Sequence, residues 1–205
     1  MKNVFITGGR GGIGQGVCHE LQNRKVNFLA PTRSELDLSD PLNIDSIDLS
    51  VIDTVIYCAG TNQGTYRGFE HNSAFNQLAQ INVNFVSALF LAKKFLQAPA
   101  AKRFLWIGSA STLEHKPFRV CYSSSKTALK YALDSLRPAY PHIIWTEVFI
   151  GRTRTNLLWK NYEGTKSREE VEKEYDKMNC LNVSQVVNAI FHGIDNDLDR
   201  VELLP

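Results

Sequence analysis

The stretch "VFITGGRGGIGQG", residues 4–16, holds six of the chain's thirteen glycines in its last nine residues. Glycine inside a strand or a helix costs about 0.5–1 kcal/mol relative to alanine. Here an apolar run leads into Thr7 and a helical pattern begins near Ile13, so the glycines lie between a predicted strand and a predicted helix. Backbone N–H groups at a helix N-terminus attract a pyrophosphate, and glycines let the backbone approach it. The stretch predicts a dinucleotide-binding turn; the alternative is a flexible loop.

Two spacings of the glycines fit this prediction. G-x-G-x-x-G places its glycines at Gly9, Gly11 and Gly14, while T-G-x-x-x-G-x-G uses Thr7, Gly8, Gly12 and Gly14. Both patterns bring glycines close to the phosphates, and the residues alone leave the choice between them open.

The rest of the chain alternates short apolar runs with longer helical patterns. Buried parallel strands are predicted from "NVFI", "VNFLA", "VIDTVIYC", "RFLWIGS" and "IIWTEVFI", and "VELLP" reads as a terminal strand. Helices are predicted over residues 13–24, 74–97 and 122–137, the last ending before Pro138, while residues 28–56 show little helical pattern. This order predicts an α/β, doubly wound parallel sheet of the Rossmann type, with residues 1–205 forming a single domain.

Composition excludes several classes of protein. The formal charge is +2 and the basic residues are scattered, so we expect neither a nucleic-acid nor a membrane partner. The longest apolar stretch is interrupted by Lys93 and Lys94, and the apolar run at the N-terminus is too short for a signal peptide. The four cysteines are far apart and show no metal-binding spacing. A cytoplasmic protein with reduced cysteines and no metal is predicted.

The residues after the second predicted strand indicate which cofactor binds. A carboxylate at this place would hold the ribose 2′-hydroxyl of NAD, but the sequence offers Arg33 first, with Glu35 and Asp37 further on. Arg33, with Arg10 from the glycine turn, suits a 2′-phosphate, so NADP(H) is predicted over NAD(H). NAD(H) stays the alternative if Glu35 or Asp37 reaches the ribose instead.

A second motif, "YSSSK", places Tyr122 and Lys126 four residues apart on one face of a helix. A nearby ammonium group lowers the pKa of a phenol, which suits tyrosine for general acid–base catalysis. Alone this spacing is common in helices. The strand "RFLWIGS", however, ends at Ser109, thirteen residues before Tyr122, and ligands of open α/β sheets bind beyond such strand ends.

Together these motifs resemble the short-chain dehydrogenase/reductase superfamily. The chain has "TGGRGGIG" for T-G-x-x-x-G-x-G, "YCAG" for N-N-A-G, "INVNF" for the helix with the active-site asparagine, "IGSAS" and "YSSSK", and "IGRTRT" for P-G-x-x-x-T. Their order matches the superfamily from Thr7 to Thr155. The resemblance favours the Gly8, Gly12 and Gly14 spacing. Two positions depart from the pattern: Cys58 replaces an asparagine and Ile150 replaces a proline.

The resemblance also implies roles for individual residues. Tyr122 would be the general acid or base, Lys126 would lower its pKa and hold the nicotinamide ribose, Ser109 would bind the substrate oxygen, and Asn84, with Asn82 as competitor, would anchor a water. Thr155 would meet the carboxamide, and Asp37 would lie near the adenine. The full set of predicted cofactor-binding residues is Thr7, Gly8, Arg10, Gly12, Ile13, Gly14, Arg33, Asp37, Leu38, Cys58, Ala59, Gly60, Tyr122, Lys126 and Thr155.

The predicted function is hydride transfer between NADP(H) and a carbonyl or alcohol substrate. The alternatives are a cofactor-retaining epimerase or dehydratase and a non-enzymatic dinucleotide sensor or scaffold. The helix through Asn84 is apolar nearly all round from Ile81 to Leu96, so we expect it to be buried on more than one side. In the superfamily this helix pairs with its copy in a second subunit, and the resemblance therefore implies a homodimer or homotetramer; a deeply buried helix of a monomer is the alternative. Residues 155–182 are a possible substrate lid in which Trp159, Tyr162 or Met178 would line the pocket. An anionic substrate is a further possibility raised by Arg119, Arg152 and Arg154.

Overall fold

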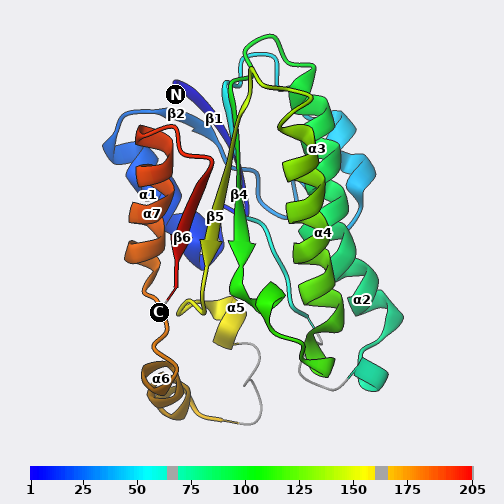
Figure 1. Cartoon of the computed structure of the whole chain (residues 1–205), viewed down its shortest axis with the longest axis vertical. Helices are drawn as coiled ribbons and strands as arrows, with labels where there is room; N and C mark the ends of the chain where they lie inside the picture. Colours follow the sequence, from blue (N-terminus) through cyan, green and yellow to red (C-terminus); the bar gives the residue numbers. More distant parts are fainter. Residues whose placement is uncertain (64–68, 160–165, 205) are drawn as a thin grey trace.

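A computed structural model of the chain describes residues 1–63, 69–159 and 166–204. Its centre is a six-stranded, all-parallel sheet in the order β2-β1-β3-β4-β5-β6. The strands are β1 (Asn3–Thr7), β2 (Asn27–Leu29), β3 (Thr54–Tyr57), β4 (Arg103–Ser109), β5 (Ile144–Ile150) and β6 (Arg200–Leu203). The prediction of a doubly wound, Rossmann-type parallel sheet is confirmed (Figure 1).

Helices cover both faces of this sheet, as Figure 1 shows. On one face, α1 (Gly12–Asn23) and α7 (Val183–Asp195) bury Val17, Leu21 and Ile190 against the even-numbered side chains of β1. The other face carries the helices that follow β3 and β4. These are α2 (Ala74–Ile81), the π-helical turn η4 (Asn82–Val86), α3 (Ser87–Leu96) and α4 (Val120–Leu136).

Strand burial follows position in the sheet. The central strands β1, β3, β4 and β5 are buried along almost their whole length, as their unbroken apolar runs predict. The prediction that "VNFLA" is a buried strand is wrong: β2 is an edge strand, and the side chains of Asn27 and Leu29 are exposed. The predicted terminal strand is present as β6 at the opposite edge. The connection from β2 to β3 contains only the short 3-10 helix η1 (Pro41–Ser46), in agreement with the weak helical pattern there.

The helix predicted over residues 74–97 is present, but it is not uniform. Ile81, Asn82, Val86 and Ser87 all have right-handed helical dihedrals, so α2, η4 and α3 run on as one rod. The π-turn at its centre was not predicted, because a helix that is apolar nearly all round shows no shift of its apolar face when one turn gains a residue. Such turns occur often at functional sites, and this one contains Asn84.

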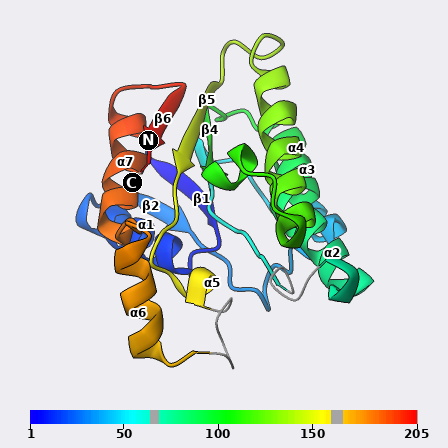
Figure 2. The same cartoon turned by 60° about the horizontal axis from the view of Figure 1, so that its bottom comes forward.

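The carboxyl ends of the strands all point to the same end of the molecule. Beyond them lie the loop with η5 (Ala110–Leu113) and η6 (Pro117–Arg119), the short η3 (Phe69–His71), and the helices α5 (Asn156–Trp159) and α6 (Arg168–Lys177). Figure 2, turned so that this end comes forward, shows α5 and α6 there. None of the helices in the described ranges combines the length and apolar character needed to cross a bilayer.

Candidate active site

A cleft of about 390 Å³ opens at the carboxyl ends of the central strands. It extends from the glycine turn after β1, past the end of β4, to the segments that follow β5. In open α/β sheets this is the place where ligands bind, next to the point where the strand order reverses on either side of β1. Ten predicted site residues line it: Gly8, Gly12, Ile13, Gly14, Cys58, Gly60, Ser109, Tyr122, Lys126 and Thr155.

In the glycine turn, segments of backbone lie so close together that a Cβ atom would clash with them. Gly8 has φ of +70°, and a Cβ there would lie 2.8 Å from the backbone of Ala59. A Cβ on Gly14 would lie 2.1 Å from the carbonyl oxygen of Gly8. Gly8 belongs only to the T-G-x-x-x-G-x-G spacing, and its positive φ is the observation that favours that spacing. Thr7 fixes the next strand, since its Oγ1 accepts a 3.2 Å hydrogen bond from the Ala59 N–H.

The start of α1 suits an anionic ligand. Its N-cap is Gly11, which supplies no side-chain hydrogen bond to the first turn, and Gly12 and Ile13 of that turn line the cleft. Uncapped N–H groups and the helix dipole together favour a phosphate. A pyrophosphate therefore fits this place for two reasons. The glycine turn has no Cβ atoms that would keep an anion away from its backbone, and the first turn of α1 has no side-chain cap.

The predicted adenine-side residues gather beyond β2, outside the cleft itself. Arg33 is exposed, and its Nε lies 3.7 Å from Asp37 Oδ1. Asp37 also accepts the Ser39 N–H at 2.9 Å, which contributes most to lowering its pKa, while Glu35 accepts the Thr32 N–H at 2.7 Å. Both carboxylates are therefore engaged by their own loop. Arg10 is exposed and Leu38 is buried in the core.

Lys126 is a buried cation at the inner wall of the cleft. Its Nζ donates a 3.1 Å hydrogen bond to the carbonyl oxygen of Ile107 in β4. Burial lowers the pKa of Lys126 to about 8, against the opposing effect of Cys58 and of Glu147 on β5. Tyr122 lies one helical turn earlier on α4 and lines the same cleft. The structure thus brings the predicted phenol and ammonium to one site.

Three serines organise the wall between β4 and α4. Ser109 Oγ lies 2.9 Å from Ser111 Oγ and accepts the Ser111 N–H at 3.3 Å. Ser123 on α4 donates a 3.0 Å hydrogen bond to the Ser111 carbonyl oxygen. Ser111 was not predicted, although it lies two positions beyond Ser109 in "IGSAS". Its contacts fix the position of the Ser109 hydroxyl.

Asn84 is fully buried behind the cleft. Its Oδ1 accepts the Thr61 N–H at 2.8 Å, and its Nδ2 donates to the Thr61 carbonyl at 2.9 Å and to Ser125 Oγ at 3.0 Å. Ser125 Oγ in turn donates to the Tyr122 carbonyl at 2.7 Å. The competitor Asn82 donates instead to the Ser39 carbonyl, away from the cleft. Asn84 therefore connects the loop after β3 to the turn of α4 that carries Tyr122.

The outer end of the cleft carries charge. Glu114, Arg119 and Arg152 line it, together with the leucines Leu113 and Leu157. Glu114 and Leu157 were not singled out from the sequence, because only the fold brings the loops after β4 and β5 together. Arg154, the third predicted arginine, is not part of the lining; it pairs with Glu172 and Asp176 on α6.

The segment predicted as a lid has a small core of its own. Trp159 and Met178 pack against a cluster of Val171, Tyr175 and Cys180, and neither lines the cleft, so their prediction as pocket residues is wrong. Tyr162 lies outside the described residues. Leu157 and Leu158 of α5 face the cleft in their place.

Other candidate chemistry is not supported by the geometry. The four cysteines are free, and burial raises the pKa of Cys58 to about 12 and raises that of Cys121 as well. Across the described ranges, no three His, Cys, Asp or Glu side chains gather in a way that would hold a metal ion. His71, His115, His142 and His192 are all exposed.

Solved structures share this fold over nearly the whole chain. A short-chain dehydrogenase from Sphingobium yanoikuyae in complex with NADPH has a TM-score of 0.80 at 19% identity, over 98% of this chain and 87% of that one. A short chain dehydrogenase family protein from Francisella tularensis subsp. tularensis SCHU S4 gives 0.80 at 20% identity, over 100% and 96%. An alcohol dehydrogenase from the archaeon Thermococcus sibiricus, complexed with 5-hydroxy-NADP, gives 0.76 at 19%, over 100% and 96%.

At the level of sequence, comparison with curated proteins gives no significant match. The model of the NAD dependent epimerase/dehydratase family matches residues 4–153, which include the glycine turn, Ser109, Tyr122 and Lys126. The chain therefore belongs to the NAD dependent epimerase/dehydratase family, and it shares the Rossmann-type fold of solved short-chain dehydrogenases.

Proposed function

We propose that the protein is an NADP(H)-preferring oxidoreductase that interconverts a carbonyl compound and an alcohol. The observation that carries this proposal is the presence of Tyr122, Lys126 and Ser109 on the wall of the cleft that also contains the glycine turn. A dinucleotide held by that turn and a substrate oxygen near Tyr122 would share one continuous space. Orientation within such a cleft supplies much of the rate in reactions of this kind.

The chain's own residues would manage the proton and the oxygen. The bound dinucleotide supplies or accepts the hydride. Tyr122 would give its phenolic proton to the carbonyl oxygen during reduction and take it back during oxidation. Ser109 would donate a hydrogen bond to the same oxygen, and the Lys126 ammonium would stabilise the phenolate that forms. Asn84 would act by holding the turn of α4 that carries Tyr122 in place. Its side chain is already hydrogen-bonded to Thr61 and Ser125, so a water in the proton relay would have to bind its main chain.

For the cofactor, Thr7, Gly8, Gly12, Ile13, Gly14, Cys58, Ala59 and Gly60 would form the pyrophosphate and ribose side, and Thr155 would meet the carboxamide. Arg33 and Arg10 would hold a 2′-phosphate, with Asp37 beside the adenine; Leu38 would meet the adenine through its main chain, because its side chain is buried in the core. Because Glu35 and Asp37 already accept backbone N–H groups of their own loop, a cationic contact beyond β2 is favoured over a carboxylate contact to the ribose. Relatives of the same fold bind NADPH or an NADP derivative.

A second candidate function is favoured by the matching family model, whose description covers epimerases and dehydratases. Such an enzyme would keep its dinucleotide bound and return the hydride to the substrate, so no net reduction of free cofactor would accompany turnover. A sensor or scaffold would bind the dinucleotide without any exchange. We further propose that the chain works as a homodimer or homotetramer in the cytoplasm, without nucleic acid or membrane, and that residues 155–182 cover the substrate end of the cleft.

The first test combines cofactor binding and turnover. Quenching of tryptophan fluorescence is titrated with NADPH and NADH for the wild type, Tyr122→Phe and Arg33→Ala, and each is assayed with a panel of carbonyl compounds. We expect tighter NADPH than NADH, a preference reduced in Arg33→Ala, and loss of turnover in Tyr122→Phe by 10²-fold or more with NADPH affinity nearly unchanged. Full turnover in Tyr122→Phe would overturn the mechanism, and tighter NADH would overturn the role of Arg33.

A further inference from the structure

The outer end of the cleft has more positive than negative charge. Glu114 is the carboxylate at the centre of this cluster: its carboxylate oxygens lie 2.6 Å from Lys116 Nζ, 3.4 Å from Arg152 Nη2 and 3.6 Å from Arg119 Nη1. Three cations thus surround one carboxylate, and these contacts lower the pKa of Glu114, with the Lys116 hydrogen bond contributing most. The cluster keeps two positive charges in excess at the mouth of the cleft.

The two guanidinium groups face the space where a substrate would extend. Arg119 and Arg152 both line the cleft, and the Arg119 side chain is only 11% exposed. Arg119 occupies the N-cap position of α4, without a capping hydrogen bond from its side chain, and precedes Tyr122 by three residues, so it lies at the same end of that helix as the predicted acid–base group. A partly desolvated guanidinium interacts with an anion more strongly than one in water does.

The contacts that the two arginines make with Glu114 are loose. N–H···O hydrogen bonds have donor–acceptor distances of about 2.7–3.2 Å, and the arginine contacts to Glu114 are longer than this. The close partner of Glu114 is Lys116. A guanidinium group carries five N–H donors in a planar arrangement that matches a carboxylate. The Glu114 carboxylate already lies between the guanidinium groups of Arg119 and Arg152.

From this arrangement we infer the chemical class of the substrate: an oxo acid or hydroxy acid whose carboxylate is held by Arg119 and Arg152, with an apolar body against Leu113, Leu157 and Leu158. Its carbonyl or hydroxyl group would lie at Tyr122 and Ser109. The inference rests on the proposed function and adds to it the group that the enzyme recognises.

Arg154 provides a control within the same loop. It lies two residues after Arg152 but does not line the cleft; its guanidinium pairs with Asp176 and, at 3.3 Å, with Glu172 on α6. Arg152→Gln and Arg154→Gln therefore remove the same charge from the same segment, at one position inside the proposed site and at one outside it.

The kinetic test uses acids and their neutral esters. Benzoylformate is compared with methyl benzoylformate, and levulinate with methyl levulinate, using NADPH at saturation. We expect the wild type to favour each acid at least tenfold in kcat/KM, and Arg119→Gln or Arg152→Gln to reduce that preference about tenfold or more. Arg152→Lys, which keeps the charge, should retain part of the preference. Arg154→Gln should keep all of it.

A binding test separates this inference from the proposed function. Phenylacetate and phenylacetamide are titrated into the NADP⁺-saturated protein, following saturation-transfer NMR signals. We expect phenylacetate to bind at least tenfold more tightly, with this difference lost in Arg152→Gln and kept in Arg154→Gln. Equal binding of acid and amide, or equal kcat/KM for acids and esters, would overturn the carboxylate site. Selective acid binding without turnover of any acid or ester would refute the proposed reaction and leave the carboxylate site standing.

Discussion

At the scale of single residues, Lys126 shows how a functional group opposes stability. Its ammonium is buried beside the cleft with the Ile107 carbonyl as its hydrogen-bond acceptor. Burial disfavours the charged form, and Cys58 and Glu147 offset part of this effect, so the pKa falls from its ordinary 10.5 to about 8. The folded protein thus binds the proton on Lys126 less tightly than the unfolded chain does. The ammonium that we propose to hold a ribose or to stabilise a phenolate is therefore kept at a cost in folding free energy.

This cost predicts a pH dependence. Between pH 8 and 10.5 the unfolded chain holds the proton of Lys126 more than the folded protein does, so the free energy of unfolding rises with pH across that window. Relative to Lys126→Met, the wild type should gain about 3 kcal/mol of stability from pH 7 to pH 10.5. Urea denaturation at several pH values measures the difference. Lys173→Met, on the exposed part of α6, should parallel the wild type; a flat wild-type-minus-Met difference would contradict the prediction.

At the scale of elements, the sequence predicts what depends on local pattern. The central strands are continuous apolar runs. The start of α1 follows from the glycines before it, and the end of α4 follows from Pro138. Local pattern does not show which elements lie next to each other in the fold. "VNFLA" resembles a buried strand, yet β2 lies at the edge of the sheet. Likewise the π-turn in the rod through Asn84 leaves no signal that can be seen in a helix that is apolar nearly all round.

The same limit applies to the site. Ser109, Tyr122 and Lys126 stand in local motifs, and all three line the cleft. Glu147 does not stand in one. It is buried on β5 and fits against Gly108 of β4, where a Cβ would lie 2.5 Å from its Oε1. Only the pairing of β4 with β5 reveals that a carboxylate acts on Lys126 from the neighbouring strand.

This pairing predicts that Glu147 on β5 raises the pKa of Lys126 on α4. Glu147→Gln removes a negative charge that favours the Lys126 ammonium, so the pKa of Lys126 should fall below its wild-type value of about 8. Titration of the Lys126 Cε signal in protein labelled with ¹³C-lysine measures this directly. Glu174→Gln, on α6, is the control and should leave the midpoint unchanged. An unchanged or raised midpoint in Glu147→Gln would show that the carboxylate does not act on Lys126.

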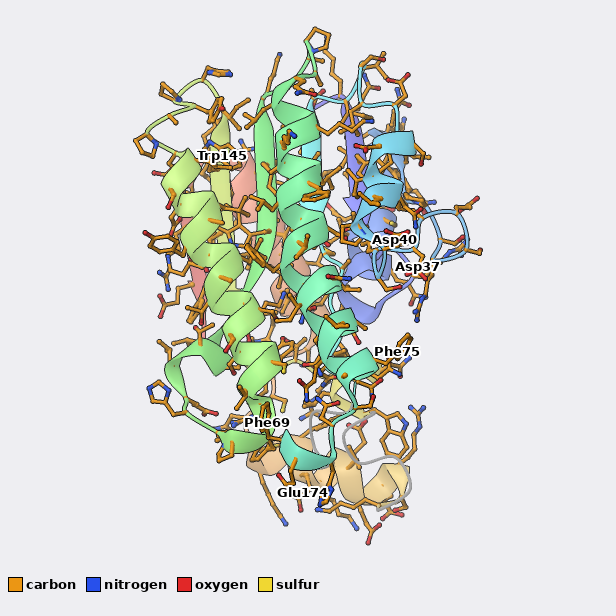
Figure 3. All side chains as sticks on the ribbon, turned by 90° about the vertical axis from the view of Figure 1, so that its right-hand side faces the viewer. Asp37, Asp40, Phe69, Phe75, Trp145 and Glu174 are labelled. Atoms are coloured by element: carbon orange, nitrogen blue, oxygen red, sulfur yellow. The ribbon has the colours of Figure 1, made fainter. Side chains whose placement is uncertain are left out.

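At the scale of the whole molecule, the helical layer formed by α2, α3 and α4 presents apolar side chains to solvent. Phe75 and Leu78 on α2 are 72% and 62% exposed, and Tyr131 on α4 is 77% exposed. Figure 3 shows this layer face-on, with α3 and α4 side by side and Phe75 labelled at the lower end of the rod. Within residues 81–96, the stretch predicted to be buried on more than one side, the side chains are mostly buried or half-buried and Phe90 is 37% exposed, so the strongly exposed apolar side chains lie at the start of the rod and on α4. A second copy packed on this layer would cover these side chains, and exposed apolar surface commonly marks contacts of this kind.

The last prediction concerns that contact. In sedimentation equilibrium the wild type should have at least twice the mass of one chain, because pairing of the helical layers buries Phe75, Leu78 and Tyr131. Tyr131→Glu and Phe75→Glu each place a charge in this contact and should shift the protein to a monomer, while the circular dichroism spectrum and NADPH binding stay close to those of the wild type. Val51→Glu, at an exposed apolar residue before β3, tests whether a new surface charge alone has this effect, and it should leave the mass unchanged. A monomeric wild type, or two variants that keep the wild-type mass, would show that these helices do not join two chains.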